Sequence, residues 1–288
     1  MRTYLFVISL CFTAFGFGQK TLKEANKLYD RAIYIEAASK YEAYLKDTEE
    51  VQPEVWLNIA DTYYNLDDIN QAKTAYDKAY STLSFEIPER HFWQYCDAIR
   101  YQGNYEKADE LYLGYLKKNG NPERVKKYTD DKKAFSEVKD KMPDITIENL
   151  DFNSEYADFG GSFNENDFIF SSARKQDYGE VYERDNTPFL SLYKIADYTA
   201  ENITADNVQL FDENLETIYH DATATFSPRG EYFYYASSYQ KDDKRVFTGK
   251  KKNFFKIYRV RATIKPYVKE ELPFNGNTFS TGQPYVTK

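Results

Sequence analysis

An alanine and a tyrosine recur at a fixed spacing in the first half of the chain, and this repeat constrains the fold more than any other feature. Ala37, Ala72 and Ala108 lie 35 and 36 residues apart. A tyrosine follows each of them four residues later, at Tyr41, Tyr76 and Tyr112. A small residue at a helix crossing lets two helices approach closely, and an aromatic ring one turn later fills the groove beside it. A period of about 34 residues is typical of repeats made of two helices, so the pattern predicts three stacked helix pairs.

The middle copy carries the fullest pattern and resembles a tetratricopeptide repeat. The consensus positions, counted from Pro53, are occupied by Trp56, Ala60, Tyr63, Ala72, Tyr76 and Ala79. After the third copy, the charged segment Pro122–Lys141 carries an apolar stripe of Val125, Tyr128, Phe135 and Val138. Terminal repeats need a polar outer face, so we expect this segment to be a helix that caps the solenoid. The predicted tetratricopeptide-repeat domain covers residues 19–141.

Residues 1–18 are predicted to be a signal peptide. Arg2 supplies a positive start, the run from Tyr4 to Phe15 is almost wholly apolar, and small glycines precede a cleavage point between Gly18 and Gln19. The apolar run is too short to span a membrane comfortably. We therefore expect an exported protein, either soluble or held to a membrane by something outside this sequence.

Composition excludes several classes of protein. Lys and Arg total 38 against 46 Asp and Glu, and the net charge of -8 argues against nucleic acid as a partner, because phosphate neutralisation dominates such binding. Two His and two Cys would all be needed for one His/Cys zinc site, so no metal is expected. Bulky Leu10 before Cys11 argues against a lipoprotein. Without the signal peptide Cys96 is the only cysteine, so no internal disulfide is expected.

From Asp144 the pattern changes to short, alternating, strand-like runs, beginning with Ile145–Leu150. A turn followed by an aromatic strand occurs at Phe226-Ser-Pro-Arg-Gly-Glu-Tyr-Phe-Tyr, and an earlier version runs from Phe163 to Ser172. A third version begins at Gly282–Val286. The copies are 63 and 60 residues apart, which is enough for about four strands, the size of a β-propeller blade with long loops.

Residues 144–288 are therefore predicted to hold two blades and the start of a third of a WD40-like β-propeller. A propeller needs about four to eight blades to close, and an open one would expose unpaired strand edges. We expect the sequence to be truncated. The predicted fold class is a multidomain α plus β protein: a helical solenoid followed by an incomplete antiparallel propeller.

No catalytic signature is present. Gly160-Gly161-Ser162 lacks the second glycine of a nucleophile elbow. His220 and Asp221 are neighbours on an expected strand, so their side chains point to opposite faces and a structural hydrogen bond is the favoured role of the histidine. We expect no enzyme activity and no cofactor.

The concave face of the solenoid is the remaining candidate site. The first helix of each pair lines this face, and aromatic and charged side chains there suit an extended peptide. The candidate residues are Asn26, Tyr29, Leu57, Asp61, Tyr64, Trp93, Asp97 and Arg100. The alternative, that these residues only pack within the protein, is equally open.

A signal peptide, tetratricopeptide-type repeats and blades with the Phe226 motif together resemble the OmpA-family envelope proteins of Bacteroidota, and the blade motif is similar to TolB-type propellers. Arg229 departs from the motif, which has Asp there, and Asn164 to Asp167 replaces the turn in the first blade. The resemblance implies further domains, including an OmpA-like peptidoglycan-binding domain that this sequence lacks.

The resemblance implies a non-catalytic periplasmic scaffold, associated with the outer membrane, that binds envelope proteins, an outer-membrane β-barrel among them. It would be tied to peptidoglycan only through the missing domain, with type IX secretion or gliding as the associated process. Two alternatives stay open: a free periplasmic peptide-binding adaptor, and the N-terminal part of a propeller-gated peptidase.

Overall fold

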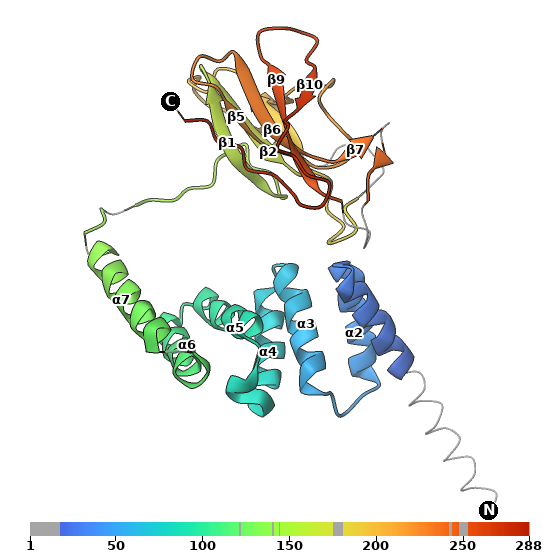
Figure 1. Cartoon of the computed structure of the whole chain (residues 1–288), viewed down its shortest axis with the longest axis vertical. Helices are drawn as coiled ribbons and strands as arrows, with labels where there is room; N and C mark the ends of the chain where they lie inside the picture. Colours follow the sequence, from blue (N-terminus) through green and yellow to red (C-terminus); the bar gives the residue numbers. More distant parts are fainter. Residues whose placement is uncertain are drawn as a thin grey trace, which may run out of the picture. The chain divides into compact units, whose positions relative to one another are not determined.

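The computed structural model describes residues 18–120, 122–139, 141–143, 145–174, 181–241, 244–247 and 253–287. The chain divides into two compact units (Figure 1). A helical unit extends to Thr146 and also includes Glu183–Asp185, and a sheet unit comprises Ile147–Tyr182 and Asn186–Lys288. The predicted α plus β class is confirmed. All of the predicted signal peptide except Gly18 lies outside the described residues.

The helical unit contains seven helices in its described part. The first covers residues 18–30. The others are α2 (Tyr34–Lys46), α3 (Pro53–Asn65), α4 (Ile69–Leu83), α5 (Glu89–Tyr101), α6 (Tyr105–Asn119) and α7 (Pro122–Lys139), with a 3-10 turn, η1 (Ser84–Glu86), between α4 and α5.

Local sequence signals set the helix ends. Pro53 occupies the first turn of α3, where its missing N–H costs nothing. The Asp68 carboxylate accepts the backbone N–H of Gln71 at 3.1 Å and so caps the start of α4. Gly103, with φ of +81°, forms the turn after α5 that other residues would strain to adopt. These signals keep the connections short, and consecutive helices consequently pack as pairs.

The alanine and tyrosine repeat forms the core of the helical unit, as predicted. Ala37, Ala72 and Ala108 are all buried, and so are the three tyrosines that follow them. The ring of Phe92 stacks on Tyr115 with centroids 4.4 Å apart, which links α5 to α6. Aromatic rings between small residues therefore hold successive helices together.

Helix α7 caps the solenoid along only half of its predicted stripe. Val125 and Tyr128 pack against the core, whereas Phe135 is 68% exposed and Val138 is also exposed. A cleft separates the C-terminal half of α7 from the α5–α6 turn, so these two apolar side chains lack a helix to pack on. The prediction of a four-residue packing stripe was wrong in this half, and the helix ends at Lys139.

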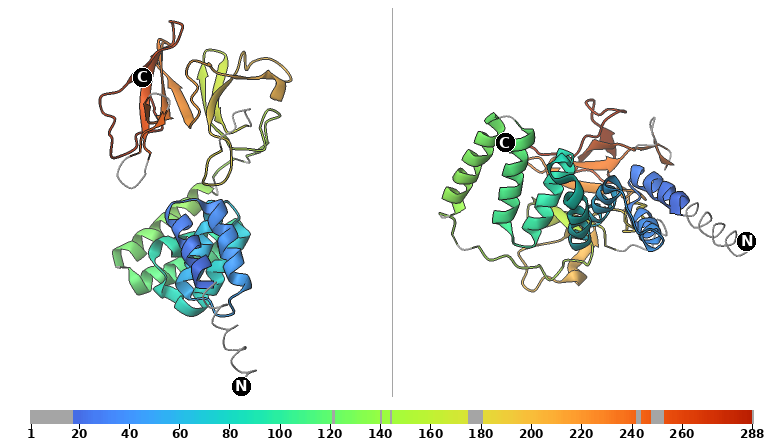
Figure 2. Two further views of the ribbon diagram at one scale, coloured as in Figure 1. Left: turned by 90° about the vertical axis from the view of Figure 1, so that its right-hand side faces the viewer. Right: turned by 90° about the horizontal axis from the view of Figure 1, so that it is seen from below.

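The sheet unit contains two four-stranded antiparallel sheets (Figure 2). The first has the order β1 (Asp158–Asn164), β2 (Asp167–Ser172), β3 (Ser191–Ile195) and β4 (Val208–Leu210), with a 3-10 turn, η2 (Ala205–Asn207), before β4. The second has the order β5 (Asp221–Phe226), β6 (Tyr232–Ser238), β9 (Phe255–Arg261) and β10 (Lys269–Glu271). β7 (Gln240–Lys241) and β8 (Lys244–Arg245) form a separate hairpin between β6 and β9.

An apolar core joins the two sheets. Ile169 and Leu192 from the first sheet meet Phe233, Tyr235 and Val260 from the second. Strand β5 contacts β1, β2 and β3, so the edge strand of the second sheet is covered by the first sheet. The prediction of about four strands per sequence unit agrees with the sheets, since each copy forms one four-stranded sheet and the second copy also contains the β7–β8 hairpin.

Two expectations about the strand-rich half differ from the structure. Ile145–Leu150 is irregular and exposed, because no neighbouring strand pairs with it in the described part of the chain. Gly282–Val286, the expected start of a third blade, also forms no strand. The two sheets do not close into a ring, so the predicted propeller is not confirmed. Among the described helices, none combines the length and apolar character that crossing a membrane requires.

Candidate binding surface of the helical repeats

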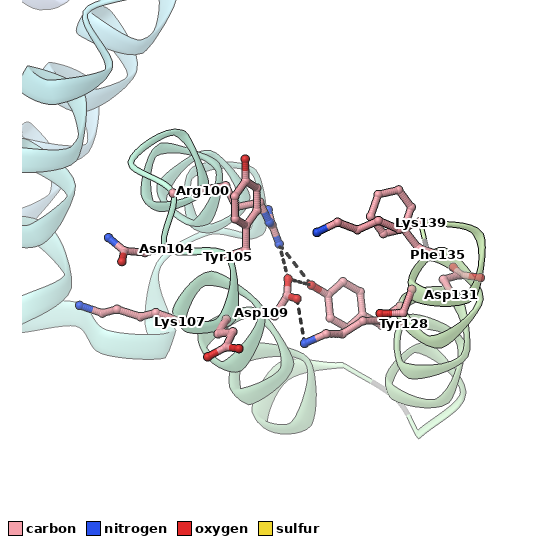
Figure 3. A pocket seen from close by; sticks show the side chains of 13 residues that line it. Arg100, Asn104, Tyr105, Lys107, Asp109, Tyr128, Asp131, Phe135 and Lys139 are labelled. Atoms are coloured by element: carbon pink, nitrogen blue, oxygen red, sulfur yellow. Dashed lines mark hydrogen bonds and ion pairs between the residues drawn. The ribbon is translucent and has the colours of Figure 1, made fainter. Parts of the chain in front are cut away.

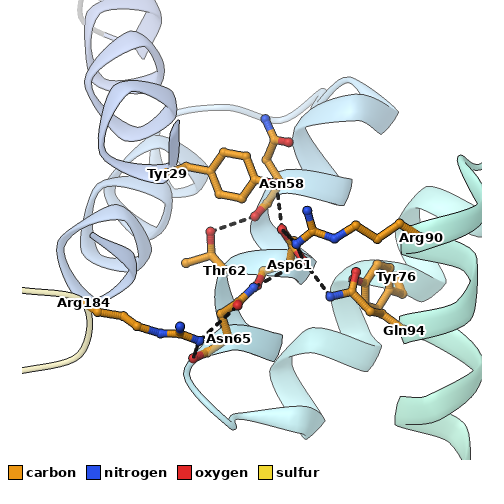
Figure 4. A network of polar contacts seen from close by, with 9 residues as sticks. All are labelled: Tyr29, Asn58, Asp61, Thr62, Asn65, Tyr76, Arg90, Gln94 and Arg184. Carbon is orange, nitrogen blue, oxygen red and sulfur yellow. Dashed lines mark hydrogen bonds and ion pairs between the residues drawn. The ribbon is translucent and has the colours of Figure 1, made fainter. Parts of the chain in front are cut away.

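Asp61 on α3 is the centre of a polar network that joins three helices (Figure 4). Its side chain is only 1% exposed. The Tyr29 hydroxyl donates to Oδ2 at 2.7 Å, and Gln94 Nε2 donates to Oδ1 at 2.8 Å. Arg90 Nη2 lies 3.2 Å from both oxygens, and Asn65 Nδ2 lies 3.3 Å from Oδ1. Both carboxylate oxygens of Asp61 thus accept hydrogen bonds from side chains within the protein.

The network neutralises a buried charge from the solvent side. Arg90 pairs with Asp61 while its own side chain stays 66% exposed. Burial and the hydrogen bond to Asp61 raise the pKa of Tyr29 well above its usual value, so the phenol remains a proton donor. Tyr29 and Asp61, both predicted to bind a partner, are brought together here as a tie between helices.

The same tie recurs one repeat later. The Tyr64 hydroxyl on α3 donates to Asp97 Oδ2 on α5 at 2.7 Å. Burial, followed by the hydrogen bond to Asp97, raises the pKa of Tyr64 to about 12. In each case a tyrosine near the end of one helix reaches an aspartate on the corresponding helix of the next pair. This tyrosine-to-aspartate tie fixes the spacing of the helices that line one face.

Two further candidate residues also make contacts within the protein. The Asn26 side-chain oxygen accepts the Tyr41 hydroxyl at 2.7 Å and Asn58 Nδ2 at 3.4 Å. Leu57 is buried in the apolar core. Their assignment to a binding face remains a prediction, and the structure shows them packing the first two helix pairs together.

Trp93 and Arg100 are two candidate residues on α5. Trp93 is 46% exposed, and it is the more exposed of the two tryptophans, Trp56 and Trp93. Arg100 Nη2 donates to Asp109 Oδ1 and to the Tyr128 hydroxyl, both at 3.2 Å, and Tyr128 also donates to Asp109 at 2.8 Å (Figure 3). Trp93 therefore leaves apolar area exposed, while Arg100 joins α5 to α6 and α7.

A contact that the sequence did not reveal involves Arg184. This residue belongs to the helical unit by its contacts. Arg184 Nη2 donates to the Asn65 side-chain oxygen at 3.1 Å, and the Arg184 carbonyl accepts the backbone N–H groups of Tyr34 and Ile35 at 3.0 and 3.1 Å. Free N–H groups at a helix start are natural partners for such a carbonyl. Arg184 lies 119 residues from Asn65 in sequence, so no local pattern could have predicted the pairing.

Cys96 and His220 are the two chemically reactive side chains to which the sequence drew attention. No group of three or more His, Cys, Asp or Glu in this part of the chain could hold a metal ion. Cys96 is buried, and burial raises the pKa of its thiol to about 12, which disfavours the reactive thiolate. His220 Nδ1 accepts the backbone N–H of Leu190 at 3.2 Å, so the histidine has the structural role that the sequence favoured.

Comparison with known proteins supports the helical half of this description. Residues 53–82, which span α3 and nearly all of α4, match the tetratricopeptide repeat family model. The match falls on the copy that carries the fullest sequence pattern. No curated protein matches the chain. Tetratricopeptide repeats point to a role in protein–protein interaction.

Proposed function

We propose that the chain is a non-catalytic scaffold whose helical repeats bind a partner protein in the cell envelope. The observation that carries the proposal is the exposed Trp93 ring on a helix of a repeat array that includes the tetratricopeptide match. The tyrosine-to-aspartate ties give this array a fixed geometry before any partner arrives. A rigid aromatic on a preorganised surface is a typical energetic centre of an interface.

The location of the scaffold is a further part of the proposal. The signal-peptide pattern in residues 1–18 supports export to the periplasm, and the resemblance to OmpA-family proteins supports an outer-membrane assembly that is tied to peptidoglycan. Type IX secretion or gliding is the process that this resemblance implies. Fractionation of the native cells, with the mass of the mature chain, tests the location. A cytoplasmic protein that retains residues 1–18 would contradict it.

Trp93→Ala tests the binding role. The native protein would be cross-linked in cells, purified from detergent-solubilised envelope, and its partners quantified by mass spectrometry. We expect the variant to lose a defined partner, because the ring supplies the buried area of the contact. Tyr101→Ala is the matched control, since it removes another exposed aromatic from the same helix. Equal partner recovery from wild type and Trp93→Ala would contradict the proposed surface.

A further inference from the structure

The helical unit contains a cleft that the repeat pattern did not predict. It has a volume of about 1270 Å³ and lies between the α5–α6 turn, the first turns of α6, and α7 (Figure 3). We call it the α7 cleft. The residues that line it include Arg100, Tyr105, Lys107, Lys132, Phe135 and Lys139.

One end of the α7 cleft is held rigidly. Asp109 accepts hydrogen bonds from Arg100 and Tyr128 and forms an ion pair with Lys132 at 2.9 Å. Two cations therefore share one carboxylate, which leaves positive charge at this end. Arg100 uses only Nη2 for these contacts, and a guanidinium has five N–H donors. Arg100 lines the cleft, and its Nε and Nη1 groups take no part in these contacts.

The charges of the lining do not balance. Four cations, Arg100, Lys107, Lys132 and Lys139, face three acids, Glu106, Asp109 and Asp131. Asp131 is already paired with Lys127, which lies outside the lining, at 3.0 Å. Among the described residues, neither Lys107 nor Lys139 has an anionic partner within ion-pair distance. The α7 cleft is thus a locally cationic site in a chain whose net charge is -8.

Aromatic side chains flank these cations. Tyr105 is 63% exposed and Phe135 is 68% exposed, although both rings carry a large apolar surface. Figure 3 shows Tyr105 beside Arg100 on one wall, and Phe135 beside Lys139 on the opposite wall. A ligand that brings carboxylates for the cations and a ring or aliphatic side chain for Tyr105 and Phe135 would satisfy both kinds of group.

We infer that the α7 cleft binds an acidic peptide segment that also carries aromatic side chains. Its carboxylates pair with Lys107, Lys139 and the free donors of Arg100, and its ring packs between Tyr105 and Phe135. The inference rests on the proposed scaffold function and names the chemistry of one segment of the partner. The cleft is distinct from the exposed face of Trp93, which does not line it.

The test uses isothermal titration calorimetry at low salt with the full chain. The probe is the acetylated, amidated peptide Asp-Phe-Glu-Asp-Phe-Glu, and its comparisons are Asn-Phe-Gln-Asn-Phe-Gln and Asp-Ala-Glu-Asp-Ala-Glu. We expect only the first to bind measurably. Lys107→Gln with Lys139→Gln should weaken binding about tenfold, since each exposed charge contact is worth a factor of about three. Phe135→Ala should also weaken it about tenfold.

Matched controls keep the test specific. Lys126→Gln removes a cation from the same helix outside the lining, and Val138→Ala trims an exposed apolar side chain beside it; neither should change binding. No heat of binding, equal binding of the amide peptide, or equal weakening by Lys126→Gln would overturn the inference. If the probe fails while a partner is still lost in Trp93→Ala, the inference falls and the proposed function stands.

Discussion

The helical unit and the sheet unit each bury an aspartate, but they treat its charge in different ways. Asp61 receives donors on both oxygens and an ion pair from Arg90. Asp221, at the start of β5, accepts the backbone N–H of Thr217 on Oδ2 at 2.7 Å. Its buried Oδ1 has no hydrogen-bond partner within the described part of the chain. One aspartate is a satisfied tie, and the other is an incompletely satisfied buried charge.

The first sheet shows that the difference is not a property of the strand motif. Ser154-x-Tyr-x-Asp158 and Thr217-x-Tyr-x-Asp221 are 63 residues apart, and each aspartate accepts a bond from the backbone N–H four residues before it. Asp158 also pairs with Arg174 at 3.1 Å. The repeated turn therefore places the carboxylate, and the balance between burial and the hydrogen bonds that each carboxylate receives, with Arg174 added for Asp158, sets the direction of its pKa shift.

Removal of the satisfied charge should have the largest effect. Asp61→Ala would leave the buried groups of Tyr29 and Gln94 without their acceptor, and we expect it to destabilise the helical unit by about 3–5 kcal/mol. Urea unfolding followed by tryptophan fluorescence reports on this unit alone, because Trp56 and Trp93 both belong to it. Glu110→Ala, which removes an exposed acid from α6, is the control. If both variants lost a similar free energy of unfolding, the Asp61 network would contribute no more to stability than an exposed acid does.

Removal of the Asp221 charge should have the opposite effect and stabilise the sheet unit. Burial raises the pKa of Asp221 from its usual 3.8 to about 6, so the folded state holds this proton more tightly than the unfolded chain does. The resulting stabilisation is complete below about pH 4 and is lost as the pH rises through about 6. Asp221→Asn should therefore stabilise the sheet unit by about 2–3 kcal/mol at pH 8 and by much less at pH 4.

Hydrogen exchange of peptides from β5 and β6, corrected for the intrinsic effect of pH, measures this change. Tryptophan fluorescence serves as the internal control, since the helical unit should unfold as in wild type. A destabilised variant at pH 8 would mean that the hydrogen bonds from Ser237 and Thr217 and the charge of Lys269 outweigh the cost of burying the Asp221 charge.

The equivalent aspartate of the first sheet should show the reverse pH dependence. Burial opposes ionisation of Asp158, but hydrogen bonds from Ser172, Ser154 and Arg174 outweigh it and lower its pKa. The stabilisation is present above the usual carboxyl range and is lost as the pH falls through the lowered value. Asp158→Asn should cost the first sheet about 1–2 kcal/mol at neutral pH, measured by exchange of β1 and β2 peptides. Slower hydrogen exchange in Asp158→Asn than in wild type would mean that the charge of Asp158, like that of Asp221, destabilises its sheet.

The sequence predicted the parts of the fold that depend on local spacing. The buried alanines and tyrosines, and four strands in each copy of the second half, follow from periods of about 35 and 63 residues that the sequence displays directly. Contacts between distant segments could not be read in this way. The Arg184–Asn65 pair and the α7 cleft depend on where a loop and a helix end lie in space, which no pattern along the chain encodes. The Ser154 and Thr217 motif was visible in the sequence but lacked a physical reason until the aspartates were seen to bond backwards along the chain.

The candidate surface shows the same division between local and spatial information. The concave-face register remains a prediction, and it could not show that Tyr64 and Asp97 bond to each other. If that bond is mainly a spacer between helices, Tyr64→Phe should cost about 1 kcal/mol in urea unfolding followed by tryptophan fluorescence, because the ring stays packed and a single hydrogen bond is lost. Partner recovery with Tyr64→Phe should match wild type, in contrast to Trp93→Ala. Loss of the partner without loss of stability would instead make the Tyr64 hydroxyl part of the interface.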